Sequence, residues 1–260
     1  MAIRQHIHSV AIITVLLIMS IALYNCSRIR FALKTSSTLS TTMTTTYHSK
    51  TATFFELAIK YKTDKVTTHH YETQYEKHLT RYRDTFLKFL EIGLGCGMPT
   101  VGASALLWRD YFGSRAELHF VEYDKSCGEG WFNRSGVKLN ITMHYGSQDN
   151  VSFLQHIIGI AKYFDVIVDD GGHMMKQQIT SIQTLIPAVR SGGLYIIEDL
   201  LTSYMSGYHG KYLDPSTTIG FIKNLVDDIQ AASPIRTVTS IGKYVRSFEV
   251  DNEICVFNIK

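Results

Sequence analysis

Acidic residues are absent from the first fifty positions of this 260-residue chain, although those positions hold five lysines and arginines. The whole chain has 26 basic and 23 acidic residues, so residues 51–260 hold 21 basic and 23 acidic residues, a net charge of −2. A slightly acidic folded region lacks the basic surface that holds a phosphate backbone, and we expect no nucleic-acid partner. The composition, 45% hydrophobic and 19% charged, excludes a disordered or collagen-like chain.

Cysteine is scarce, and the four cysteines form neither a CxxC pair nor a spacing typical of metal ligands. This pattern excludes a zinc ribbon and a miniprotein held together by disulfides. It leaves the redox compartment open. The cysteines are Cys26, Cys96, Cys127 and Cys255.

Formally charged residues are also missing from positions 5–27, and positions 10–24 form an apolar run broken only by Thr14 and Ser20. The length of the run lies between that of a cleaved signal peptide and the roughly 20 residues that span a bilayer. Ser20 and Ala22 resemble a cleavage site, but apolar residues continue beyond them. We therefore expect an uncleaved signal anchor, one transmembrane helix within residues 1–27. A cleaved signal peptide and a buried core helix are the alternatives.

A stretch rich in serine and threonine follows the apolar run. Ten of the twelve residues at positions 35–46 are Ser or Thr, a composition that cannot bury a core. We predict a flexible stalk at residues 28–50. The folded domain is then expected at residues 51–260.

Two signals disagree on the side of the membrane that the domain would occupy. Arg28, Arg30 and Lys34 outnumber the single basic residue before the apolar run, and the positive-inside rule would place the domain in the cytosol. Against this, four of the seven asparagines begin N-x-S/T sequons, which are glycosylation acceptors in the secretory pathway. We predict a single-pass membrane glycoprotein of the ER or Golgi with a lumenal domain. The sequons begin at Asn25, Asn133, Asn140 and Asn150.

Within residues 51–260, short apolar runs alternate with helical patterns. A helical, aromatic-rich segment at 51–83 comes first. The runs predict buried parallel strands at 86–92, 117–122, 141–145, 164–169 and 194–198. Apolar residues recur every three to four positions over 151–161, 179–189 and 219–229. Two final runs, at 244–250 and 254–259, predict an antiparallel hairpin. This order predicts an α/β fold with a doubly wound, Rossmann-like sheet, mostly parallel, with an antiparallel C-terminal hairpin.

The first predicted strand runs into a glycine-rich turn, EIGLGCG. Alternating glycines let a ligand approach backbone N–H groups directly. Met98 stands where a dinucleotide-binding fingerprint needs Gly or Ala, which argues against nicotinamide. The second predicted strand ends in an acid. A glycine-rich turn together with such an acid resembles the S-adenosylmethionine (SAM) methyltransferases, in which the acid holds the ribose of the cofactor. A plain loop without a ligand is the alternative. The predicted cofactor contacts are Glu91, Gly93, Gly95, Gly97, Glu122 and Asp149, the last also being a candidate helix cap.

Four carboxylates and a histidine follow the fourth and fifth predicted strands. The strands end in the sequences DDGGH, residues 169–173, and EDL, residues 198–200. Because carboxylates at neighbouring strand ends repel one another, a hard cation such as Mg²⁺ is expected there. The predicted ligands are Asp170, Glu198 and Asp199, and His173 is the predicted general base. Helix capping by the acids, and a structural histidine, are the alternatives.

Several motifs together resemble the metal-dependent macrolide sugar O-methyltransferases of the mycinamicin and macrocin type. They are YKTDK at 61–65, HY at 70–71, LEIGLG at 90–95, DDGGH at 169–173 and EDLLTSY at 198–204. The resemblance covers about residues 61–260 and implies a class I methyltransferase that binds SAM. It also implies that the three acids named above bind Mg²⁺ and that the histidine deprotonates a sugar hydroxyl. The predicted anchor, and the lack of room for the long amino-terminal region of several members, depart from the family.

These observations predict a SAM-dependent, Mg²⁺-assisted O-methyltransferase that acts on a hydroxyl of a sugar-like or polyol acceptor. One alternative is a methyltransferase of a small catechol-like or lipid acceptor. Another is a catalytically inactive, membrane-anchored protein with the same fold. The expected partners are the small hydroxylated acceptor and, through the anchor, the membrane, while the oligomeric state is left open.

Overall fold

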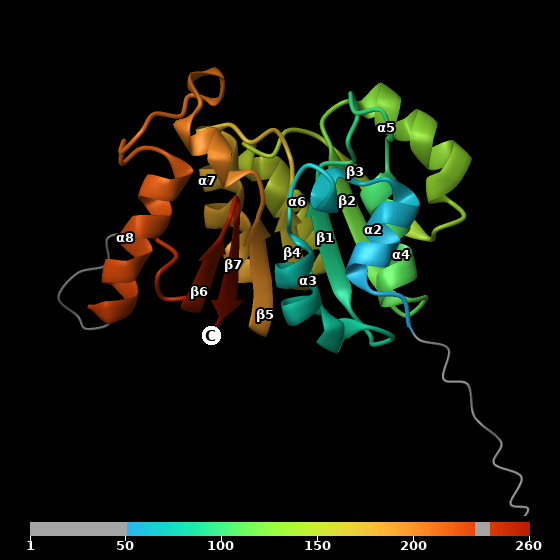
Figure 1. Ribbon diagram of the computed structural model, residues 1–260, viewed down its shortest axis with the longest axis horizontal. Coiled ribbons are helices and arrows are strands. Elements are labelled where there is room, and N and C mark those ends of the chain that lie inside the picture. Colours follow the sequence, from blue (N-terminus) through green and yellow to red (C-terminus); the bar gives the residue numbers. More distant parts are fainter. Residues whose placement is uncertain (1–50, 232–239) are drawn as a thin grey trace, which may run out of the picture. The chain divides into compact units, whose positions relative to one another are not determined.

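Seven strands form one sheet in the computed structural model, which describes residues 51–231 and 240–260 (Figure 1). The strands are β1 (Lys88–Ile92), β2 (Glu117–Glu122), β3 (Ile141–Tyr145), β4 (Phe164–Asp169), β5 (Val189–Ile197), β6 (Val245–Asp251) and β7 (Ile254–Ile259). Their order is β3-β2-β1-β4-β5-β7-β6. Strands β1 to β5 pair in parallel, and β7 pairs antiparallel with β5 and β6. The predicted fold class is confirmed.

Helices connect the strands and precede the first one. They are α2 (Phe54–Tyr61), α3 (Glu72–Leu79), α4 (Ala103–Phe112), α5 (Lys125–Trp131), α6 (Val151–Ala161), α7 (Met175–Leu185) and α8 (Thr218–Gln230). Shorter helical turns are η1 (Asp64–Val66), η2 (Thr80–Tyr82), η3 (Phe132–Gly136), η4 (Ile186–Ala188), η5 (Leu200–Tyr204) and η6 (Ser206–Tyr208). Side chains cap several starts: Thr53 caps α2, Asn150 caps α6 and Thr217 caps α8.

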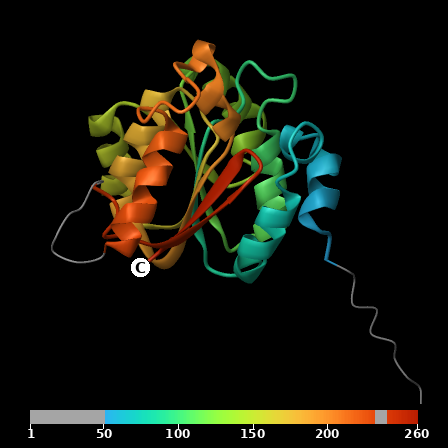
Figure 2. The ribbon, with the colours of Figure 1, turned by 60° about the vertical axis from the view of Figure 1, so that its left-hand side comes forward.

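The sheet separates two apolar cores, because neighbouring residues of a strand point to opposite faces. Phe89 of β1 joins a core with Trp108 of α4, whereas the next residue, Leu90, joins a core with Leu154 of α6. In Figure 2, α2, α3 and α4 lie on one side of the sheet and α7 and α8 on the other. The sheet is therefore covered on both faces, as a doubly wound fold requires.

Some boundaries differ from the prediction for identifiable reasons. The first strand begins at Lys88 rather than at residue 86, since the Phe86 side chain is 85% exposed. The helix expected up to residue 189 ends at Leu185, and a 3₁₀ turn containing Pro187 follows. Strand β5 then starts early and passes through a register shift against β4 between Phe164 and Val166.

No helix within residues 51–231 and 240–260 has the length and apolar character needed to cross a bilayer. The described residues therefore do not bear out the predicted membrane attachment, the membrane partner or the localisation as a single-pass, lumenal glycoprotein of the ER or Golgi. The segments on which those predictions were based, the anchor at 1–27 and the stalk at 28–50, lie outside the described residues.

An aromatic cluster centred on Trp108 joins the lead-in helices to the sheet. The Trp108 ring is fully buried, and its centroid lies 5.1 Å from those of Tyr75 and Phe89 and 5.4 Å from that of Phe54. Helices α2 and α3 are thus held against β1 through one side chain.

We expect Trp108→Ala to lower the free energy of unfolding by about 3–5 kcal/mol, because the substitution leaves a large cavity in this cluster. Urea denaturation followed by circular dichroism measures the change. Phe86→Ala is the matched control, since that exposed ring is expected to contribute little. Equal stability of both variants would show that the lead-in helices do not depend on the cluster.

Candidate active site

The carboxyl ends of β1, β2, β4 and β5 meet at one edge of the sheet. Backbone hydrogen bonds continue just beyond the strands: Gly93 N–H donates to Val121 O at 2.9 Å, and Asp170 N–H donates to Ile92 O at 3.0 Å. Glu198 N–H likewise donates to Asp169 O at 3.0 Å. The glycine-rich turn and the acidic residues are therefore direct neighbours.

The three glycines of the turn have different surroundings, although all have a positive φ. A Cβ on Gly93 would lie 1.9 Å from the carbonyl oxygen of Asp170, so packing against β4 requires glycine there. A Cβ on Gly95 would meet only the Met98 side chain, at 3.7 Å, and one on Gly97 would meet nothing within 4 Å. The backbone at Gly95 and Gly97 is thus open to a ligand.

Glu122, at the end of β2, is bonded to the glycine-rich turn. One carboxylate oxygen accepts from the backbone N–H groups of Leu94 at 3.3 Å and Cys96 at 3.4 Å, and the other accepts from Asp124 at 2.8 Å. The side chain is nearly buried. Glu122 therefore lies beside the glycine-rich turn.

The two other predicted cofactor residues lie on either side of that position. Glu91 is fully buried, accepts a 2.6 Å hydrogen bond from Ser104 and lies 3.4 Å from the Lys65 ammonium. Asp149 is partly exposed beyond β3, where it accepts from Ser147 at 2.6 Å and pairs with Lys176 at 3.0 Å. Glu91 thus lies among the carboxylates around Lys65, whereas Asp149 lies beyond β3 and is partly exposed to solvent.

A disulfide between Cys96 and Cys127 joins the glycine-rich turn to α5, with a Cα–Cα distance of 6.1 Å. The sequence analysis missed this pair. The signal was present, because Cys96 follows β1, Cys127 lies in the first turn of the helix after β2, and the carboxyl ends of these two paired strands are adjacent. The disulfide fixes the turn beside Glu122.

Asp170, His173 and Asp199 form the open part of the acidic site. One potential ligand atom from each lies within 4.8 Å of the others. His173 Nε2 is 3.4 Å from Asp199 Oδ2 and 4.0 Å from Asp170 Oδ1, and all three side chains are about one-fifth exposed. His173 Nδ1 is buried and has no hydrogen-bond partner among the described residues. The ring nitrogen of His173 that faces the acids is therefore Nε2.

Glu198, the third predicted metal ligand, lies one layer deeper. Its two oxygens are 2.7 and 2.8 Å from the ammonium of Lys65, and it also accepts a hydrogen bond from the Tyr75 hydroxyl. Lys65 contacts Asp170 Oδ2 as well, at 2.7 Å. The structure brings Asp170, Asp199 and His173 together, whereas Glu198 joins them through Lys65.

Lys65 is a site residue that the sequence analysis missed, although the resemblance included its motif. Its side chain is 1% exposed. Burial alone would lower the pKa of the ammonium, but the charges of Asp170 and Glu198 outweigh burial and hold that pKa well above its usual range. The lysine is therefore a permanent buried cation among the carboxylates.

Asp169 has a different role from its neighbour Asp170. It is fully buried and accepts hydrogen bonds from Gln148 at 2.8 Å, from Tyr195 at 3.2 Å and from Ser181. Burial raises the pKa of its carboxyl to about 6. Because side chains alternate along a strand, Asp169 stabilises the fold while Asp170 faces the site.

The fold and the strand-end site define a class I methyltransferase. Residues 90–200 match a family described as "Methyltransferase domain". The chain is 37% identical over 180 residues to the 8-demethyl-8-(2-methoxy-alpha-L-rhamnosyl)-tetracenomycin-C 3'-O-methyltransferase of Streptomyces olivaceus, covering 66% of this chain and 44% of that protein. It is 35% identical over 183 residues to the mycinamicin VI 2''-O-methyltransferase of Micromonospora griseorubida, covering 67% and 43%.

A solved structure agrees with these relatives. The MycE methyltransferase of mycinamycin biosynthesis, in complex with Mg and SAH, superimposes with a TM-score of 0.71 at 30% identity, covering 81% of this chain and 54% of that one. The chain belongs to the class I methyltransferases and, within them, resembles the macrolide sugar O-methyltransferases. It spans less than half the length of the curated relatives named above.

The buried lysine generates a prediction about stability. Lys65→Met removes the one cation from a group of buried carboxylates, and breaking a buried ion pair in this way typically costs about 3–5 kcal/mol. We expect that loss in the free energy of unfolding measured by urea denaturation with EDTA present. We expect Mg²⁺ to restore part of it.

Lys60→Met is the control, because the Lys60 ammonium pairs with Asp110 on the surface and its loss is expected to change little. A Lys65→Met protein as stable as the unsubstituted chain would mean that the carboxylates do not need the lysine.

Proposed function

We propose that the domain transfers the methyl group of SAM to a hydroxyl of a sugar or polyol acceptor, with the help of Mg²⁺. One observation carries the proposal: the open glycine-rich turn with Glu122 is in direct backbone contact with the site formed by Asp170, His173 and Asp199. A cofactor site and a site able to activate a hydroxyl thus share one edge of the sheet, where doubly wound folds bind ligands.

The acidic residues fit a hard divalent cation. Asp170 and Asp199 present partly exposed carboxylate oxygens, the ligand type that Mg²⁺ prefers. Lys65 supplies one positive charge to a group of four carboxyl groups that also includes Glu91 and Glu198. A bound cation would polarise the acceptor oxygen and lower the pKa of its hydroxyl. Asp170 and Asp199 are the proposed ligands. Glu198 becomes a third ligand only when its hydrogen bonds to the Lys65 ammonium break.

His173 is the proposed general base. Its Nε2 faces the acidic residues and accepts the hydroxyl proton of the acceptor. The carboxylate of Asp199, 3.4 Å away, stabilises the imidazolium that results. His173 has φ +56°, and the two glycines before it pack against Gln148 and Gln177 with no room for a Cβ.

SAM would lie against Gly95 and Gly97, with its ribose toward Glu122. The related MycE structures that support this assignment contain SAH. The backbone at these two glycines is open, whereas Gly93 is enclosed by β4. The cofactor therefore contacts the outer part of the turn, and Gly93 serves packing.

Two observations support a sugar-like acceptor. The relatives' names specify O-methylation of rhamnosyl, olivosyl and related sugar hydroxyls. Beyond Asp199 the chain exposes large apolar side chains, and the Tyr208 ring centroid lies 6.4 Å from that of His173. Such a wall suits a sugar that carries an apolar group. The exposed residues are Leu201, Tyr204, Met205, Tyr212 and Leu213.

The cofactor assignment predicts that Gly95→Val abolishes SAM binding, because a branched side chain would fill the open face of the turn. Isothermal titration calorimetry with SAM measures the loss. Gly192→Val is a matched control: Gly192 has φ +78°, close to the +82° of Gly95, and a Cβ there would meet nothing within 4 Å, whereas one on Gly95 would make only ordinary contact with Met98, at 3.7 Å. Both variants have the same backbone strain, so only loss of SAM binding confined to Gly95→Val supports the assignment.

The base assignment predicts that His173→Ala lowers turnover by about 10²–10⁴, the usual contribution of a general base, while SAM and Mg²⁺ bind as before. Initial rates with rhamnosides and other simple glycosides, with calorimetry for both ligands, test this. Asp170→Asn is expected to lose Mg²⁺ affinity and keep SAM affinity. Loss of Mg²⁺ affinity in His173→Ala would make the histidine a ligand instead.

A further inference from the structure

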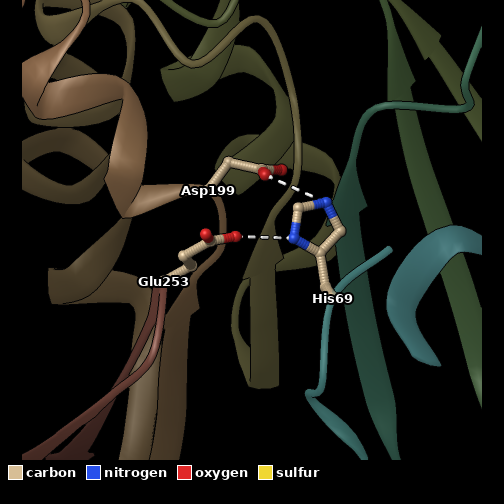
Figure 3. A group of neighbouring side chains, drawn as sticks. All are labelled: His69, Asp199 and Glu253. Atoms are coloured by element: carbon tan, nitrogen blue, oxygen red, sulfur yellow. Dashed lines mark hydrogen bonds and ion pairs between the residues drawn. The ribbon is translucent and has the colours of Figure 1, made fainter. Parts of the chain in front are cut away.

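A second histidine, His69, lies between two carboxylates that are far apart in the sequence. Its Nδ1 is 2.7 Å from Glu253 Oε2, and its Nε2 is 3.3 Å from Asp199 Oδ1 (Figure 3). His69 lies between η1 and α3, Glu253 lies in the turn between β6 and β7, and Asp199 follows β5. Three separate regions of the chain therefore meet at this ring.

The surroundings of His69 hold the ring in place. It stacks on the fully buried ring of Tyr71, with centroids 4.9 Å apart and planes at 12°. The backbone N–H of His69 donates to Asp64 O at 3.0 Å. One face of the His69 ring is covered and both of its nitrogens face carboxylates, so these contacts fix the orientation of the imidazole.

The same groups also fix the backbone of Asp199. Its N–H donates to the Tyr71 hydroxyl at 3.2 Å, and the next N–H, that of Leu200, donates to Glu253 O at 2.9 Å. Asp199 has φ +56°, a left-handed conformation that persists in a non-glycine residue only where neighbours determine it. Tyr71 and Glu253 provide those contacts.

The two oxygens of Asp199 face different partners. Oδ1 faces His69, and Oδ2 faces His173 and the open part of the site. We propose that His69, held by Glu253, is a positioning residue that fixes Asp199 Oδ1 and so aims Oδ2 at a divalent cation. This inference rests on the proposed function, because it concerns the cation that the acidic site would hold. Hydrogen-bonded partners of this kind commonly orient metal-binding carboxylates.

The test measures Mn²⁺ binding to the full chain by electron paramagnetic resonance, with SAM binding by calorimetry alongside. We expect His69→Ala to weaken Mn²⁺ affinity by about 10–100-fold, the usual effect of losing such a partner, and to leave SAM affinity unchanged. His69→Gln, which keeps a donor, should recover part of the loss. Glu253→Gln should weaken Mn²⁺ binding less than His69→Ala does.

His78→Gln is the matched control. His78 Nε2 lies 3.2 Å from Glu249 Oε2, so this pair also joins α3 to the β6–β7 hairpin, but neither residue contacts the acidic site. If His69 only docked the lead-in segment onto the hairpin, the two histidine substitutions would have the same effect. We expect His78→Gln to bind Mn²⁺ like the unsubstituted chain.

The other outcomes overturn the inference. Unchanged Mn²⁺ affinity in His69→Ala, or an equal loss in His78→Gln, would remove the positioning role while leaving the proposed function intact. Two Mn²⁺ ions per chain, one of them lost in His69→Ala, would make His69, Asp199 and Glu253 a second metal site instead. An unsubstituted chain that binds SAM but no Mn²⁺ would overturn the metal dependence itself. If His69→Ala fails to fold, His69→Gln and Glu253→Gln decide the question.

Discussion

The ammonium of Lys65 is the interaction on which the rest of the site depends. It lies within 2.7 Å of Asp170 and Glu198 and 3.4 Å of Glu91, and the lysine side chain is 1% exposed. Carboxylates buried this closely would repel one another without a cation among them. The lysine therefore explains why the sequence before β1 must fold against the sheet: without that segment the carboxyl ends of β1, β4 and β5 would carry uncompensated charge.

The two halves of the site are built differently. The half assigned to SAM is local, because its glycine-rich turn, Glu122 and the disulfide of Cys96 with Cys127 all belong to the β1–β2 region. The acidic half is assembled from the lead-in segment, the ends of β4 and β5, and the hairpin turn that carries Glu253. Substitutions can therefore disturb cation binding without disturbing the cofactor half.

The strands and the strand-end carboxylates could be predicted from the sequence because both are local signals. A β-branched run that ends in Asp169-Asp170 predicts a buried strand and acids at its carboxyl end. Lys65 and His69 could not be placed in this way, since no periodicity connects residues 65 and 69 to strands more than a hundred positions later. The antiparallel hairpin was predicted, but its contact with Asp199 depends on how β7 pairs with β5.

The position of Glu198 shows what a strand-end pattern leaves undetermined. The sequence places Glu198 and Asp199 side by side, and both were predicted ligands. Strand β5 ends at Ile197, and a left-handed turn at Asp199 directs its carboxylate to the open site while Glu198 stays beneath, bonded to Lys65. The contacts that Tyr71 and Glu253 make around Asp199 maintain that turn. The chemistry proposed for the site thus depends on a backbone conformation that distant segments determine, rather than on the acidic pair alone.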